Sequence, residues 1–181
     1  MGMKEFLDNL SSRKPVPGGG SVSAVSGALA ASLGAMVCNL SDIPAEKMGS
    51  LRNDLQELGK KDEEAFKEVM KSYKAKNKEK KDKALKRASL VPLETAEKCL
   101  EVLEELEPIG KKGKKSAITD IGVGALLAYA GIEGAILNIK INHKYIRDEE
   151  FITKTTQRYE EVQRKGKDRK DAIMNYVEDC L

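Results

Sequence analysis

Apolar residues recur along the chain at the steps of three and four that an α-helix places on one face. The clearest example lies in residues 45–74, where polar and charged side chains fill the intervening positions. This spacing predicts an amphipathic helix whose apolar stripe packs on a core. The apolar positions of the stripe are Met48, Leu51, Leu55, Leu58, Ala65 and Val69.

One position of that stripe is charged. The step from Leu58 to Ala65 passes through Asp62, so the pattern places a carboxylate on the face that the helix buries. A buried carboxylate is costly unless it has a partner. We therefore predict that Asp62 either caps a neighbouring helix, pairs with a lysine, or has a chemical role.

The same periodicity predicts helices in the rest of the chain, and no segment reads as a convincing strand. A short helix is expected over residues 6–10, and longer ones over 21–40, 83–107, 119–143 and 148–181. Pro92 lies inside the helix of residues 83–107 and is expected to kink it. The charged run of residues 74–83 is expected to be a mobile connection or an extended helix end. These segments predict an all-α fold, a single domain over residues 1–181 built as a bundle of five to six helices.

Residues 15–41 carry no charge, although 34% of the chain is charged. Their length allows a membrane span, but serines and Asn39 dilute them, and Ala and Gly outnumber Leu and Ile. A nucleotide-binding loop is also disfavoured, because "PGGGS" lacks the P-loop lysine and follows no strand. We favour a buried helix with Ser21 as its N-cap, whose free N–H groups can hold a carbonyl, carboxylate or phosphate.

A line of small and polar residues runs along one face of the helix expected over residues 119–143. The glycines and alanines on this line allow another backbone or a flat ligand to approach closely, and the polar side chains supply hydrogen bonds. Both a ligand-binding face and a tight helix crossing fit this pattern. The line consists of Asp120, Gly124, Ala128, Gly131, Ala135, Asn138 and Asn142.

Composition narrows the function classes. The net charge is only +3 and aromatic residues make up 4% of the chain, so no nucleic-acid partner is expected. The three cysteines lie far apart in apolar surroundings, which indicates reduced thiols and a cytoplasmic protein. His143 is the only histidine, so we expect neither a zinc site nor another bound metal.

Four segments together resemble the formiminotetrahydrofolate cyclodeaminase and methenyltetrahydrofolate cyclohydrolase family. They are "KPVPGGGS" with the small-residue helix after it, "KKDEEAFKEVM", "SLVPL" and "TDIGVGALLAYAGIEGAILNIKIN", which are similar to the family in order and spacing. Two departures stand out. Thr119 takes the place of a serine before the aspartate, and "GKKGKK" replaces a Gly-Asn element.

The resemblance implies an enzyme that acts at the N5/N10 methenyl bridge of tetrahydrofolate. The folate derivative would be its substrate, with no metal, and the protein would be a homodimer without a membrane partner. Asp62 would be the catalytic acid or base, and Asp120 a second catalytic group. The residues implied to bind substrate are Pro17, Gly18, Gly19, Gly20, Ser21, Asn138 and Asn142.

Two questions stay open at this point. Cyclohydrolase and cyclodeaminase share the reacting carbon and the proton relay, although a stand-alone chain leans toward the cyclohydrolase. A non-catalytic helical binding or scaffold protein of the same fold is the alternative to both. One further hypothesis assigns the polyglutamate tail of folates to a basic loop, whose lysines are Lys111, Lys112, Lys114 and Lys115.

Overall fold

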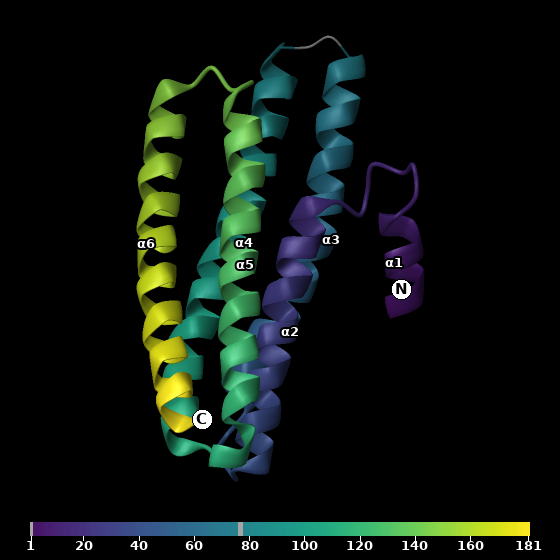
Figure 1. Cartoon of the computed structure of the whole chain (residues 1–181). Coiled ribbons are helices and arrows are strands. Elements are labelled where there is room, and N and C mark those ends of the chain that lie inside the picture. The colour runs from purple at the N-terminus through teal and green to yellow at the C-terminus, as the bar shows by residue number, and fades with distance from the viewer. Residues whose placement is uncertain (1, 76–77) are drawn as a thin grey trace.

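The computed structural model describes residues 2–75 and 78–181, and all regular structure in these ranges is helical (Figure 1). The expected all-α class is therefore confirmed. The elements are α1 (Met3–Leu10), α2 (Gly19–Leu40), α3 (Glu46–Lys74), α4 (Lys78–Lys112), a short 3-10 turn η1 (Lys115–Ala117), α5 (Ile118–His143) and α6 (Glu149–Cys180).

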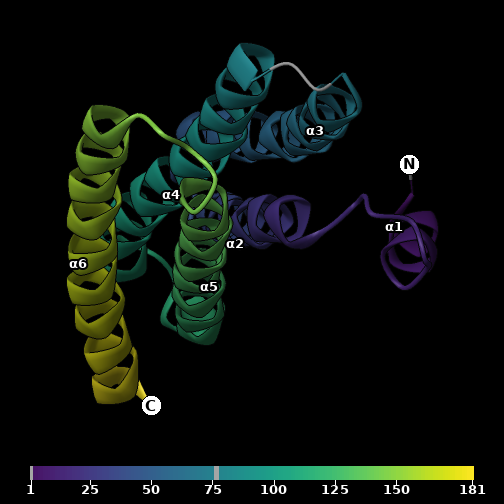
Figure 2. The ribbon, with the colours of Figure 1, turned by 90° about the horizontal axis from the view of Figure 1, so that it is seen from above.

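Helices α2 to α6 form the bundle, with α4 at its centre. Helix α4 packs against α2, α3, α5 and α6, while α2 also packs against α3 and α5. Helix α6 runs along α4 and α5 on the side away from α3 (Figure 2). Helix α1 has no buried residue and lies apart from the bundle, joined to α2 by the proline- and glycine-containing loop (Figures 1 and 2).

Small residues bring α2, α4 and α5 close together at the centre of the bundle. A Cβ added at Gly27 on α2 or at Gly131 on α5 would lie 2.5 or 2.8 Å from the sulfur of Cys99 on α4. Gly131 also faces the backbone carbonyl of Ser23. The glycines and alanines of α5 therefore make a tight helix crossing, and only the asparagine end of this face extends beyond it.

The structure corrects the expected start of the second helix. Helix α2 begins at Gly19 with Gly18 as its N-cap, and no side chain caps it. Ser21 is not the N-cap, because its hydroxyl is turned toward α3 and hydrogen-bonds there. The first turn of α2 therefore keeps the backbone N–H groups of Gly19 and Gly20 without a side-chain cap.

Helix α4 is longer than its periodicity predicts. It begins at Lys78, so residues 78–83 of the charged run are an extended helix end, while residues 76 and 77 lie outside the described residues. It ends at Lys112 and contains both Pro92 and Pro108. Salt bridges from Lys86 to Asp82 and Asp148 help to hold this extension.

In the part of the chain that the structure describes, two helices are long and apolar enough to cross a membrane, Gly19–Leu40 and the segment Lys115–His143. About half of the most apolar window of each is buried by the rest of the bundle, 56% and 50% respectively. Their remaining large apolar side chains are exposed on adjacent helices, and we call this surface the α2–α5 face. It consists of Val22, Leu29, Met36, Leu40, Val123, Leu126, Leu137 and Ile141.

Candidate active site

A cleft of about 280 Å³ lies where α2 begins and α5 ends. The loop before α2 and its first turn form one side, α3 and α4 form the second, and the last turns of α5 form the third. Asp62 lies in this cleft, so the one charged position of the α3 stripe faces an opening in the core. The lining residues are Pro15, Val16, Gly18, Gly19, Gly20, Asp62, Phe66, Val69, Ala88, Asn138, Ile141 and Asn142.

Asp62 is held by the first turn of α2. Ser21 Oγ donates a hydrogen bond to Asp62 Oδ2 at 3.2 Å, and the Ser21 backbone also hydrogen-bonds to the carboxylate. Ser21 Oγ further contacts the carbonyl oxygen of Gly59, one turn before Asp62. Asp62 forms no ion pair with a lysine or arginine of the described ranges. Asp62 therefore hydrogen-bonds to the first turn of α2 and also presents a carboxylate to the cleft.

Gly20 is required for this contact. A Cβ built at Gly20 would collide with the carboxyl group of Asp62, whereas Gly19 has more room and meets only the Asn138 amide at 3.5 Å. Because Gly20 has no side chain, the backbone of α2 can lie directly against a charged side chain of α3.

Asn142 is oriented by a carbonyl group that a proline leaves free. Within a helix, the N–H of residue 92 would bond to the carbonyl of residue 88, but Pro92 has no N–H. The Ala88 carbonyl instead accepts a hydrogen bond from Asn142 Nδ2 at 2.8 Å. The "SLVPL" segment of α4 therefore positions an amide of α5 at the edge of the cleft.

Asn138 lies one turn earlier on α5 and is oriented within its own helix. Its Nδ2 donates to the Gly134 carbonyl at 2.8 Å, and its amide group lies against Gly19. The two asparagines and the first turn of α2 therefore surround the cleft with hydrogen-bonding groups. Phe66, Val69 and Ile141 supply apolar surface beside them.

Burial changes the acidity of Asp62. Desolvation raises the pKa of its carboxyl group above the ordinary value, although the hydrogen bonds from Ser21 act in the opposite direction. A half-buried carboxylate with a raised pKa is a stronger base than an exposed one and holds a proton at a higher pH. Asp62 is therefore suited to accept and return a proton within the cleft. Among the described residues, no group of three or more His, Cys, Asp or Glu side chains is placed to hold a metal ion.

Comparison with known proteins identifies the family of the chain. The family model for formiminotransferase-cyclodeaminase matches residues 2–161. A methenyltetrahydrofolate cyclohydrolase of Methylorubrum extorquens is 37% identical, over 82% of each chain. The chain belongs to the formiminotransferase-cyclodeaminase family.

Other relatives in this family extend the comparison to a solved structure. The formiminotetrahydrofolate cyclodeaminase of Thermotoga maritima superimposes with a TM-score of 0.95 at 32% identity, covering 99% of this chain and 96% of that one. A formimidoyltransferase-cyclodeaminase of Gallus gallus is 30% identical over 84% of this chain. The chain spans only 32% of that longer relative.

Within this family member, the structure brings most of the expected site residues together, but Pro17, Ser21 and Asp120 do not line the cleft. Ser21 contributes through its hydrogen bond to Asp62. Pro17 is buried and does not line it, whereas Pro15 and Val16 do. Asp120 lies in the first turn of α5, eighteen residues before Asn138, and is thus about 27 Å away along the helix axis. Asp120 therefore cannot act with the Asp62 of the same chain.

Several cleft residues were not expected from the sequence. Phe66 follows Asp62 by four residues within "DEEAF", so the helical period places it on the same face. The sequence pattern predicts Val69 only as part of the apolar stripe of residues 45–74. No local pattern marks Ala88, because its role depends on a proline four residues later and an asparagine on another helix.

Proposed function

We propose that the cleft binds the methenyl bridge of a reduced folate and that the protein is a 5,10-methenyltetrahydrofolate cyclohydrolase. The observation that carries this proposal is the position of Asp62, a carboxylate with a raised pKa that faces the cleft between the start of α2 and the asparagines of α5. The similarity of this chain to the Methylorubrum extorquens cyclohydrolase, over most of both chains, supports the same assignment.

In the hydrolytic reaction, Asp62 is the general base. A water oxygen adds to the cationic methenyl carbon between N5 and N10, and Asp62 takes the proton that the water loses. The hydroxyl of this adduct then releases its proton to solvent and becomes the formyl carbonyl as the bond from the carbon to N5 breaks. Asp62 returns its own proton to N5, and 10-formyltetrahydrofolate leaves. The negative charge of Asp62 also favours the cationic substrate, and a bound cation lowers the pKa of Asp62 while it is present.

The second candidate reaction is cyclodeamination, favoured by the match to the Thermotoga maritima cyclodeaminase. Here N10 of 5-formiminotetrahydrofolate attacks the carbon of the protonated, cationic formimino group. The proton that N10 loses passes through Asp62 to the departing nitrogen, and ammonia leaves as the methenyl bridge closes. The same carboxylate serves both reactions, because both need one proton moved over a short distance.

One experiment separates these reactions from a scaffold role. Purified protein is given each folate, and methenyl absorbance is followed. A cyclohydrolase removes the absorbance of methenyltetrahydrofolate, while a cyclodeaminase generates it from 5-formiminotetrahydrofolate with release of ammonia. A non-catalytic helical binding protein leaves both solutions at the uncatalysed rate, and that result would reject the proposed function.

We also propose that the protein is a homodimer joined through the α2–α5 face. The eight large apolar side chains of this face are between 38% and 67% exposed in the single chain. A soluble protein rarely leaves so continuous an apolar surface uncovered. A second copy offers the same face, and two-fold pairing buries both copies at once.

A further inference from the structure

A lysine lies between two tyrosine rings at the end of the bundle that contains the cleft. Lys81 Nζ on α4 is 3.9 Å from the ring centroid of Tyr73 on α3 and 5.8 Å from that of Tyr145, which follows α5. Both rings are about half exposed, at 43% and 54%. The two rings restrict the lysine side chain while leaving the group open to solvent.

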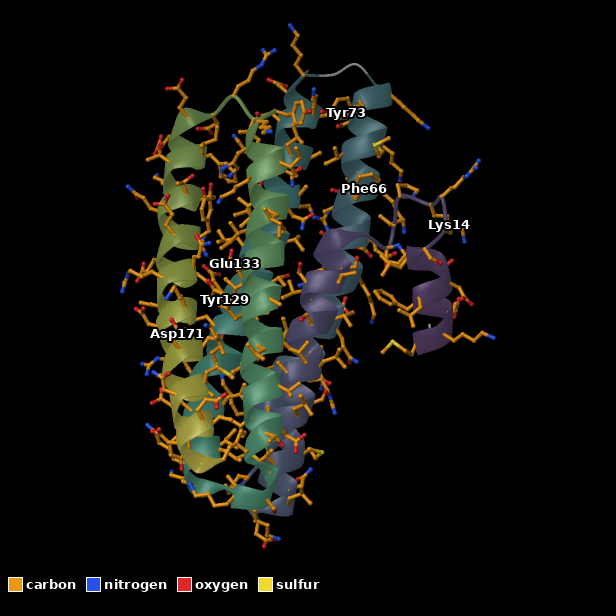
Figure 3. The ribbon with its side chains drawn as sticks, viewed as in Figure 1. Lys14, Phe66, Tyr73, Tyr129, Glu133 and Asp171 are labelled. Atoms are coloured by element: carbon orange, nitrogen blue, oxygen red, sulfur yellow. The ribbon has the colours of Figure 1, made fainter. Side chains whose placement is uncertain are left out.

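Lys81, Tyr73 and Tyr145, which we call the Lys81 group, lie just beyond the cleft on the three sides that line it. Tyr73 lies one turn beyond Val69 on α3, and Lys81 lies two turns from Ala88 on α4, about 11 Å along the helix axis. The Tyr145 backbone N–H bonds to the carbonyl of Asn142, so this ring lies next to the last turn of α5. Figure 3 shows Tyr73 and Phe66 on α3, with Tyr73 nearer the helix end.

The charge of Lys81 has no carboxylate partner in the ranges 2–75 and 78–181. No carboxylate oxygen there lies within 4.0 Å of its Nζ. Its neighbours on α4 differ, because Lys86 pairs with Asp82 and Asp148, and Arg87 pairs with Glu68. Lys81 is half-buried, so it presents a pre-oriented cation that no carboxylate of the described ranges neutralises.

We propose that Lys81 binds the glutamate carboxylate of the folate whose methenyl bridge lies at Asp62, which rests on the function proposed above. The benzoyl ring and its amide separate N10 from this carboxylate by about 10 Å, from ordinary covalent bond lengths. That length matches the two helical turns between Ala88 and Lys81. Phe66 provides an aromatic surface on the way, and the anionic end meets a cation instead of the acidic cleft.

The basic loop after α4 does not offer this contact within the same chain. Lys111 lies 23 residues after Ala88 on the same helix, which places it about 35 Å away along the axis. A single glutamate on a folate bound at Asp62 cannot reach that far. Within one chain, the Lys81 group therefore lies nearer than the loop lysines to a single glutamate on the bound substrate.

The test compares two substrates that differ only in the glutamate. Turnover of 5,10-methenyltetrahydrofolate and of 5,10-methenyltetrahydropteroate, which lacks the glutamate, is followed by methenyl absorbance for wild type and Lys81→Met. We expect the wild type to have a KM about tenfold lower for the folate, the size of one charge-assisted contact. Lys81→Met should raise the KM for the folate about tenfold, and leave kcat and the KM for the pteroate unchanged.

Two further variants keep the test specific. Lys83→Met removes an exposed lysine that lines a different groove between α3 and α4, and it should change neither KM. Tyr73→Leu removes a half-exposed ring and should raise the KM for the folate alone, by less than Lys81→Met does. Melting curves confirm that each variant is folded.

The outcomes separate this inference from the proposed function. A wild type that turns over both compounds with the same KM, or a Lys81→Met variant that raises both KM values alike or neither, overturns the role of Lys81 and leaves the proposed function standing. A wild type that neither turns over nor binds either compound overturns both.

Discussion

At the scale of single residues, the site depends on one carboxylate in an otherwise apolar stripe. The sequence pattern was sufficient to single out Asp62, because six neighbouring apolar positions define the buried face of α3 so clearly. The pattern could not tell which element contacts the carboxylate. That depends on the approach of α2, whose first turn supplies the Ser21 hydroxyl and backbone.

Replacing Asp62 separates activity from stability. Asp62→Asn removes the proton acceptor, so kcat should fall by about 10²- to 10⁴-fold. Folding raises the pKa of Asp62 above 3.8. Its contribution to stability is therefore fully present only below pH 3.8 and is lost as the pH rises through the raised value. At neutral pH the charged form costs stability, and Asp62→Asn should unfold at a higher urea concentration than wild type.

The pH dependence of stability tests whether ionisation of Asp62 is the reason why Asp62→Asn is more stable than wild type. The difference in urea midpoint between Asp62→Asn and wild type should be largest at neutral pH and should shrink as the pH falls toward 3.8. A difference that does not vary with pH would mean that ionisation of Asp62 is not its source. Near-wild-type turnover in this variant would remove Asp62 from the mechanism.

Gly20 allows a sharper test of geometry. Gly20→Ala adds a Cβ that collides with the Asp62 carboxyl group, so the carboxylate must move and kcat should fall by at least about tenfold, part of the loss expected for deleting the base. Alanine favours the helix by up to about 1 kcal/mol, so this loss should occur without unfolding. Gly59→Ala is the matched control, since its Cβ would make only ordinary contacts of 3.7 Å or more. Equal kcat values for the two variants would contradict this account of Gly20.

At the scale of elements, helical periodicity predicted every long helix, and it was least reliable at helix ends. The start of α2 moved from Ser21 to Gly19 because a tertiary contact took the serine hydroxyl. Periodicity also placed Asp120 and Asn138 on one face of α5, but a shared face does not mean that two residues are close along the helix axis. Two residues that share a face can therefore belong to opposite ends of the molecule.

The contact between α4 and α5 predicts a coupling between Pro92 and Asn142. Asn142→Ala leaves the Ala88 carbonyl without its partner and should lower the free energy of unfolding by about 1–3 kcal/mol. In a Pro92→Ala background, the new N–H at position 92 can bond to that carbonyl within the helix. The same Asn142→Ala change should then cost clearly less. Urea unfolding of the four proteins in this double-mutant cycle measures the coupling, and equal costs in both backgrounds would exclude it.

At the scale of the whole molecule, the α2–α5 face explains how a charge-rich chain can contain two helices of membrane-spanning length. One half of each helix is buried in the bundle, and the proposed dimer covers the other. Leu137→Glu places a charge at the most exposed position of the face, at 67%, and should convert the protein to a monomer in light scattering. Leu90→Glu is the control, because Leu90 is exposed at 42% on α4 and lies outside the face. A dimer that survives Leu137→Glu would exclude this face.

The proposed dimer also offers a way in which Asp120 can reach a cleft. The exposed side chains of α5 run from Val123 to Ile141, so a two-fold axis near the middle of this helix brings the start of one α5 close to the end of the other. In the proposed dimer, Asp120 of the partner subunit would then lie near Asn138 and Asn142. We expect Asp62→Asn and Asp120→Asn each to be nearly inactive alone. Mixed at equal amounts after unfolding and refolding, they should recover about a quarter of wild-type activity, because half of the dimers then contain one intact site.

If Asp120→Asn alone keeps full activity, Asp120 has no catalytic part. If the mixture stays inactive although mixed dimers form, the two carboxylates do not meet across the dimer.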